Sequence, residues 1–251
     1  TMIYYFSGTG NSLYVAKHLA DALGEKLCPM TSPVPTDDSV IGLVFPVYAW
    51  GIPNVVERFV RKHRDSCLAA GAKKGGYLYA VMTCGDDMGY ADRVLEKELG
   101  RELDAAFSVL MPDVYICLPG FDVDSEEECR EKFTMEKKMV KDIVACISER
   151  KSLRCLKRGP FPWLKSYAIR PLFNRYLVTD KYFNVDGSRC VSCKKCINMC
   201  PVGNIVMKDD LPQWQSDCSG CLACYHACPH HAINFGKMTQ KKGQYTLPKD
   251  L

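Results

Sequence analysis

Apolar runs alternate with helical repeats along the first part of the chain. Residues 2–6 (MIYYF) are a short apolar run rich in β-forming side chains, and residues 13–23 (LYVAKHLADAL) have the apolar spacing of a helix. Residues 39–53 contain an apolar strand that leads into the helical pattern NVVERFVRKH, and residues 77–99 repeat the same order. This alternation predicts a parallel sheet with helices on both faces.

Two further elements follow. Residues 107–112 (FSVLMP) have the pattern of a last strand, and residues 125–150 have that of a long amphipathic helix. The acidic start and basic end of this helix suit its macrodipole. The sequence therefore predicts that the sheet region ends near residue 150.

The stretch from Arg150 to Arg175 contains no acidic residue. Its basic residues alternate with four aromatic residues, Phe161, Trp163, Tyr167 and Phe173. Two interpretations stay open. The stretch either bridges two domains with its aromatic side chains, or it presents a docking face to an acidic redox partner or an anionic membrane surface.

The glycine-containing loop SGTGNS, residues 7–12, lies between the first strand and the first helix. Such a junction directs backbone N–H groups and the positive end of the helix at one point, where they can bind a phosphate without a lysine. An ordinary strand-to-helix turn is the alternative. The loop is neither G-x-G-x-x-G nor a loop ending in Gly-Lys-Ser/Thr, so a single terminal phosphate is a better ligand than a dinucleotide or a nucleoside triphosphate.

Composition and charge narrow the functional classes. The chain has 251 residues, a net charge of +4 and fifteen cysteines, seven of which are scattered and therefore do not look like a disulfide framework. The net charge is too small to imply nucleic acid. No leader pattern and no apolar stretch of about 18 residues is present, so we expect a cytoplasmic protein without a transmembrane segment.

The other eight cysteines form two runs that share the spacing C-x2-C-x2-C-x3-C-P. The first run contains Cys190, Cys193, Cys196 and Cys200, and the second contains Cys218, Cys221, Cys224 and Cys228. Three thiolates from one tight loop and a distant fourth suit the corners of a [4Fe–4S] cluster. Structural zinc normally uses ligand pairs with a longer spacer, and disulfides need an oxidising compartment. We interpret the nearby His226, His230 and His231 as surface or packing residues.

Residues 183–236 resemble the bacterial dicluster ferredoxin family, and this resemblance implies one-electron carriage. In two-cluster ferredoxins the fourth cysteine of each run ligates the other cluster. One predicted set is therefore Cys190, Cys193, Cys196 and Cys228, and the other is Cys218, Cys221, Cys224 and Cys200.

Residues 2–150 resemble the flavodoxin family. FSGTGNS is similar to its phosphate loop, and FPVYAWGIP and TCG fall where that family places its two flavin-ring loops. The resemblance implies an α/β fold, a doubly wound five-stranded parallel sheet in the order 2-1-3-4-5, with FMN at its edge. The implied FMN contacts are Ser7, Gly8, Thr9, Gly10, Asn11, Ser12, Pro46, Val47, Tyr48, Ala49, Trp50, Gly51, Thr83, Cys84, Gly85 and Tyr90.

Two of these residues have simpler interpretations. Trp50 could be a packed surface aromatic residue. Cys84 is expected to be an inert small residue, because no neighbouring positive charge lowers the pKa of its thiol.

The two parts in this order resemble the fused flavodoxin–ferredoxin proteins of anaerobic bacteria called EFR1-type ferredoxins. The predicted organisation is a flavodoxin-like domain (2–150), a basic and aromatic connector (151–182), a small α+β dicluster ferredoxin domain (183–236) and a tail (237–251). The expected function is electron transfer between two [4Fe–4S] clusters and FMN, serving an external redox partner protein. The alternative is an FMN-dependent reductase that acts directly on a small substrate such as a quinone.

Overall fold

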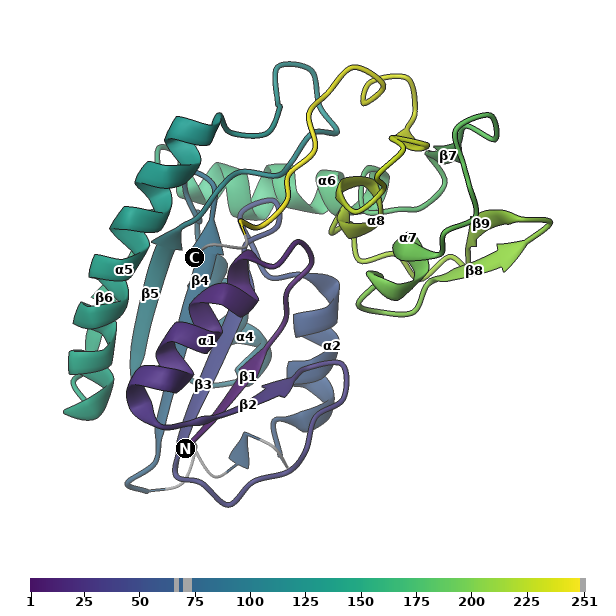
Figure 1. Ribbon diagram of the computed structural model, residues 1–251. Helices are drawn as coiled ribbons and strands as arrows, with labels where there is room; N and C mark the ends of the chain where they lie inside the picture. The colour runs from purple at the N-terminus through teal and green to yellow at the C-terminus, as the bar shows by residue number, and fades with distance from the viewer. Residues whose placement is uncertain (66–67, 70–73, 249–251) are drawn as a thin grey trace.

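The computed structural model describes residues 1–65, 68–69 and 74–248. Cys67 and the last three residues of the predicted tail, 249–251, lie outside the described residues. A sheet-based part comes first along the chain, and the cysteine-rich part follows it (Figure 1).

The first part is built on one parallel sheet in the order β2-β1-β3-β4-β5-β6. Its strands are β1 Met2–Tyr5, β2 Lys26–Pro29, β3 Val40–Pro46, β4 Tyr77–Cys84, β5 Ala105–Leu110 and β6 Leu153–Cys155. The first five follow the predicted doubly wound order. The prediction of five strands is wrong by one, because the start of the connector pairs along β5, with Ala105 opposite Leu153. All three residues of β6 are exposed, so backbone pairing rather than side-chain burial holds this edge strand.

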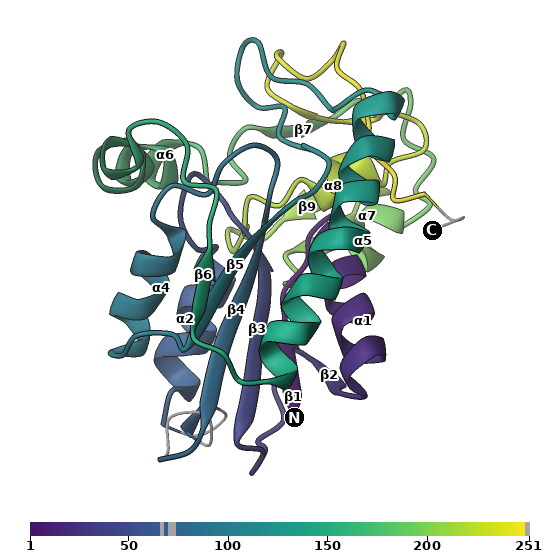
Figure 2. The same ribbon diagram turned by 90° about the vertical axis from the view of Figure 1, so that its left-hand side faces the viewer.

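Helices cover both faces of the sheet, as the alternating pattern predicts (Figure 2). Helices α1 (Asn11–Leu23) and α5 (Glu126–Ser148) lie on one face, and α2 (Asn54–His63) and α4 (Ala91–Leu99) on the other. The start of α5 is fixed by a capping box, in which Ser125 and Glu128 bond each other's backbone N–H groups.

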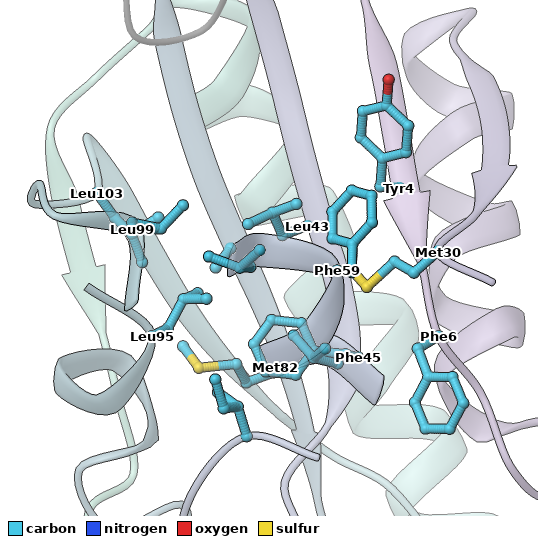
Figure 3. Close-up of a cluster of buried hydrophobic side chains, with 14 of the residues drawn as sticks. Tyr4, Phe6, Met30, Leu43, Phe45, Phe59, Met82, Leu95, Leu99 and Leu103 are labelled. Carbon is cyan, nitrogen blue, oxygen red and sulfur yellow. The ribbon is translucent and has the colours of Figure 1, made fainter. Parts of the chain in front are cut away.

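Two apolar layers fill the space between the helices and the sheet. On the α2/α4 side, Phe59 packs against Tyr4 with ring centroids 5.2 Å apart, and Leu95 and Met82 lie together at the other end of the same cluster (Figure 3). On the other side, Val15, Phe107 and Ile143 belong to a second fully buried cluster. Burial on both faces explains why β3 and β4 are almost continuously apolar.

The connector continues from β6 into a π-helical turn, η1 (Leu164–Ile169), and helix α6 (Arg170–Tyr176). Several of its basic residues form ion pairs with acidic residues of the sheet part. Arg158 and Arg154 pair with the buried Asp92 at 2.8 and 3.4 Å, and Lys165 pairs with Asp87 at 2.6 Å. These ion pairs fix the connector against α4 and the loop after β4, as a bridging element requires.

The cysteine-rich part consists of short elements around a small core. Strand β7 (Phe183–Val185) pairs with β10 (Ile233–Phe235), and β8 (Ile205–Lys208) pairs with β9 (Leu211–Trp214), both antiparallel. Two short helices, α7 (Lys195–Asn198) and α8 (Ala223–His226), lie between the strands. This part lies beyond the carboxyl ends of the parallel strands, and the chain after β10 returns toward that edge (Figure 1).

No helix among the described residues has the length and apolar character needed to cross a membrane.

Candidate cofactor sites

The eight cysteines line two separate cavities in the cysteine-rich part. One cavity is bordered by Cys190, Cys193, Cys196 and Cys228, which we call the outer set. The other is bordered by Cys200, Cys218, Cys221 and Cys224, which we call the flavin-side set. Each cavity thus takes three cysteines from one run and the last cysteine from the other run. Four thiols around one cavity are the donor chemistry that a [4Fe–4S] cluster requires.

Backbone N–H groups donate to the last cysteine of each run, which is the cysteine that joins the set of the other run. The N–H of Asn204 donates to Sγ of Cys200, and the N–H of Ala232 donates to Sγ of Cys228, both at 3.3 Å. Such bonds favour a negatively charged sulfur, as a cluster ligand needs to be. The residues present therefore fit the cluster at both cavities.

The two sets differ in exposure. Cys193 of the outer set is exposed, and its neighbour Val191 keeps 58 % of its surface open to solvent. Cys196 and Cys228 of the outer set are buried, and Cys190 is partly exposed. In the flavin-side set Cys224 is buried, and the other three are partly exposed. Of the eight cysteines, Cys193 is thus the one that is open to solvent.

A larger cavity of about 290 Å³ opens at the carboxyl edge of the sheet. Strands β1, β3, β4 and β5 all end at it, as expected for a ligand site in a doubly wound fold. Its walls carry all of the predicted FMN contacts except Gly10, Gly51 and Tyr90.

The loop at residues 7–12 forms one end of this cavity. The N-terminus of α1 has no side-chain cap, so its free N–H groups point into the loop. The Asn11 side chain is already bonded, because its amide donates to the carbonyl of Pro112 at 2.9 Å and accepts from the Tyr245 hydroxyl at 2.6 Å. The Ser12 hydroxyl lies 2.7 Å from that of Thr83. The Gly10 N–H donates to the Ser7 hydroxyl oxygen at 3.2 Å. The other backbone N–H groups at the start of α1 and the hydroxyls of Ser7 and Thr9, which line the cavity, are thus the donors that this loop can offer to a phosphate.

The loop after β3 forms a second wall in a strained conformation. Ala49 and Trp50 both have positive φ angles, 46° and 57°, which non-glycine residues rarely adopt. The connector holds this shape, because the Ser166 hydroxyl donates to the Trp50 carbonyl at 2.7 Å and accepts from the Tyr90 N–H at 2.8 Å. Lys165 lies 5.3 Å from the Trp50 ring centroid. A strained loop held by a buried hydroxyl at a cavity is typical of a functional site.

Tyr90 does not reach the cavity. Its ring packs under the guanidinium of Arg158, 4.8 Å away, and near Tyr167, so it belongs to the connector contact. Gly51 lies behind the loop, where a Cβ atom would come within 2.0 Å of Arg170.

Two titratable groups on the cavity wall have shifted pKa values. Burial raises the pKa of the Cys84 thiol to about 12, with a further contribution from Asp87, which agrees with its interpretation as an inert residue. Burial also raises the pKa of Asp113, and this carboxyl accepts a hydrogen bond from the Tyr115 N–H at 2.9 Å. Asp113 can therefore hold a proton at a higher pH than an ordinary aspartate.

The flavin-side set forms part of the same cavity wall. Gly220, Cys221 and Leu222 line it, and a Cβ atom on Gly8 would lie only 2.5 Å from Cβ of Cys221 and 2.9 Å from the Tyr48 hydroxyl. Glycine at position 8 thus lets the cysteine loop touch the phosphate loop. Sequence patterns do not indicate this contact, because it joins residues more than 200 positions apart.

Three further contacts fix the cysteine-rich part at this edge. Asn54 at the start of α2 donates to the Cys218 carbonyl at 3.2 Å. The His226 ring lies between the carbonyl of Val114, 2.9 Å from Nε2, and the N–H of Tyr245, 3.0 Å from Nδ1. His226 is buried, so it is a packing residue, whereas His230 and His231 are exposed.

One edge of the cavity is formed by residues that no sequence pattern indicated. Residues 111–115 follow β5, and Lys165 and Phe173 come from the connector. The first group could have been found by the rule that located the other loops, since it follows a parallel strand. The connector residues carry no such signal.

Comparison with known proteins identifies the C-terminal part. Residues 189–233 match the family model of the 4Fe-4S dicluster domain. Over 52 residues the chain is 38 % identical to pyruvate synthase subunit PorD of Methanocaldococcus jannaschii, covering 20 % of this chain and 59 % of PorD. Over 44 residues it is 39 % identical to a ferredoxin-like protein in the nif region of Trichormus variabilis, covering 17 % of this chain and 38 % of that protein. The chain thus spans less than two thirds of either relative.

Solved structures align with the larger part of the chain. Rubredoxin oxygen:oxidoreductase from Desulfovibrio gigas has a TM-score of 0.34 and 15 % identity, over 59 % of this chain and 36 % of that one. An FMN-dependent NADH-azoreductase from Bacillus anthracis has a TM-score of 0.34 and 9 % identity, over 57 % of this chain and 98 % of that one.

The strand order and the matched domain together define the architecture. The parallel order β2-β1-β3-β4-β5 is that of a flavodoxin-like sheet, and the matched segment is an iron–sulfur ferredoxin domain. The chain therefore joins a flavodoxin-like part to a dicluster ferredoxin part, as predicted, and an iron–sulfur ferredoxin domain supports a role in electron transfer.

Proposed function

We propose that the protein is an electron carrier that binds two [4Fe–4S] clusters and one FMN and serves an external redox partner in an anaerobic cytoplasm. When bound, each cluster supplies one-electron transfer and FMN supplies one- or two-electron transfer. The predicted cysteine sets and those predicted FMN contacts that line the cavity carry over into this proposal, as do the EFR1-type subtype and the predicted domain boundaries.

One observation supports this function above all others. Cys221 belongs to the flavin-side set and also lines the cavity proposed for FMN. The same cysteine loop touches Gly8 of the phosphate loop. The chain therefore holds two sets of cofactor-binding residues against each other, which is what electron exchange inside one polypeptide needs.

The outer set suits contact with a partner through Cys193. This cysteine is exposed and does not line the cavity proposed for FMN, so a partner protein can approach it without disturbing that cavity. The connector is less suited to bind an acidic partner through charge, because Arg154, Arg158 and Lys165 are already paired.

A second candidate function is direct reduction of a small substrate. Asp113 favours it, because burial raises the pKa of this carboxyl and its Oδ2 atom would lie 2.9 Å from a Cβ atom on Gly85 at the cavity wall. A carboxyl that keeps its proton at the cavity could deliver it to a substrate. Anaerobic assays with quinones or unsaturated compounds distinguish the two functions, since a carrier is reoxidised faster by a protein acceptor than by any of these compounds.

The cofactor content tests the proposal. Protein purified without oxygen should hold about eight irons and one flavin per chain. Cys221→Ala should lose about four irons, whereas the matched control Cys84→Ala, which removes a buried cysteine outside both sets, should keep about eight. Zinc in place of iron, or equal iron loss in both variants, would contradict the proposed sites.

A further inference from the structure

The cysteine-rich part has an internal pseudo-symmetry that permits a position-by-position comparison of the two sets. Ile205 follows Cys200 by five residues, and Ile233 follows Cys228 by five residues. Ile205 pairs with Trp214 in one two-stranded sheet, and Ile233 pairs with Val185 in the other. Trp214 and Val185 are therefore equivalent positions.

A second pair of equivalent positions lies in the cysteine loops themselves. Ser219 directly follows the first cysteine of its run, Cys218, and Val191 directly follows Cys190. At both pairs of positions the flavin-side set has a side chain with an N–H or O–H group, and the outer set has a valine.

The polar atoms of both side chains are buried at the flavin-side cavity without a partner. Trp214 and Ser219 line that cavity together with its four cysteines. The indole nitrogen of Trp214 and the hydroxyl oxygen of Ser219 are shielded from solvent and have no hydrogen-bond partner of regular geometry. A buried N–H or O–H group without a partner costs free energy, so both positions need a function.

Both groups are placed to serve the cysteine sulfurs of this cavity. Trp214 and Ser219 border the same small cavity as the four cysteines of the flavin-side set. Because neither the indole N–H nor the hydroxyl O–H is bonded elsewhere, both are free to donate to a thiolate there.

The position of Trp214 is fixed from two sides. Its ring stacks on Phe183, with centroids 5.1 Å apart and ring planes 10° from parallel. Its backbone is held in β9 by the pairing with Ile205. The indole N–H therefore keeps its direction toward the cavity.

We infer that Trp214 and Ser219 are side-chain hydrogen-bond donors to the thiolates of the flavin-side set, and that they raise the reduction potential of the cluster bound there. Donors to cluster sulfurs stabilise the reduced cluster, which carries the additional negative charge. The backbone donors of Asn204 and Ala232 are matched between the sets. The flavin-side set has one further backbone donor, the Gly220 N–H at 3.3 Å from Sγ of Cys218, and the two side chains add to this difference between the clusters. The inference rests on the proposed function, because it requires a cluster at each set.

A redox titration followed by electron paramagnetic resonance tests this role. The signal of the flavin-side cluster is identified as the one that Cys221→Ala removes. In Trp214→Phe, which keeps an aromatic ring for Phe183, the ratio of reduced to oxidised flavin-side cluster at a fixed potential should fall about tenfold, or about 59 mV for one electron. Ser219→Ala should lower this ratio by less. The reduction potential of the outer cluster should not change in either variant.

The control is Val191→Ala, which shortens the equivalent side chain of the outer set without removing a donor. It should leave the potential of the flavin-side cluster unchanged. The inference is overturned if both variants keep eight irons and an unchanged flavin-side potential, or if both clusters shift equally. If the unmodified protein binds no iron, the proposed function fails together with the inference.

Discussion

The sheet part and the cysteine-rich part obtain their stability from different sources. The sheet part buries long apolar strands between two layers of helices, with Ile3, Tyr79 and Phe107 almost completely shielded from solvent. The cysteine-rich part has strands of only three or four residues, and its buried core includes Cys196 and Cys224. Short strands with so small a core are marginal without a metal. Iron bound to the cysteines would therefore take the place of an apolar core in this smaller part of the chain.

Iron removal should have the largest effect, because it should unfold the cysteine-rich part and leave the sheet part folded. Chelation under anaerobic conditions should abolish amide-exchange protection in residues 189–233 and preserve it in β3 and β4, because only the first region depends on metal ligands. Hydrogen exchange measured by mass spectrometry resolves the two regions. Equal loss of protection in both would show that the sheet part also depends on the clusters.

The second prediction concerns Ser166, whose hydroxyl holds the loop after β3 in place. Ser166→Ala leaves the half-buried Trp50 carbonyl and Tyr90 N–H without their shared partner, so the free energy of unfolding should fall by about 2 kcal/mol. Flavin affinity should fall as well, because the strained loop at Ala49 and Trp50 loses its support. Denaturant unfolding and flavin titration measure the two effects.

Ser152→Ala is the matched control in the same connector, because Ser152 is exposed. Its stability should stay within about 0.5 kcal/mol of the unmodified protein. A similar loss of stability in both variants would contradict the role of Ser166 in holding the loop after β3.

The contact between the two parts can be broken at Gly8. Because a Cβ atom there would lie 2.5 Å from Cβ of Cys221, Gly8→Ala should force the cysteine loop outward and cost about 2 kcal/mol. Gly187→Ala is the control, since its nearest atom lies 4.0 Å away, and it should be close to neutral. Thermal unfolding of the iron-loaded variants compares them, and equal stabilities would place the cysteine loop away from Gly8.

The smallest expected effect concerns pH. The folded-state pKa of Asp113 is raised above 3.8, so its contribution to stability is complete at low pH and is lost as the pH rises through the folded value. Asp113→Asn keeps an acceptor for the Tyr115 N–H but removes the ionisation. The stability of the variant relative to the unmodified protein should therefore increase from about pH 4 to about pH 8. A pH-independent difference would argue against a protonated Asp113.

Local patterns in the sequence predict those elements that are formed by local burial. β1, β3, β4 and β5 are recognisable because their side chains are nearly all buried. β2 is harder to recognise, because only Cys28 in it is buried, and β6 is entirely exposed. Both of these strands form because a neighbouring strand offers free backbone groups.

The candidate sites also contain features that the sequence predicts and features that it does not. The phosphate loop and the cysteine runs are contiguous, so their chemistry is visible in the sequence. The contacts of Cys221 with Gly8, of Ser166 with Trp50 and of Tyr245 with Asn11 join distant segments. Their formation depends on how the two parts pack, which no local pattern encodes.

The rate of flavin reduction after rapid reduction of the clusters tests the central claim most directly. If the flavin-side cysteines line the FMN cavity within one chain, the reaction is first order and its rate constant is independent of protein concentration. Anaerobic flash photolysis at several protein concentrations measures it. A rate that rises in proportion to protein concentration would show that electrons pass between molecules and would contradict the account.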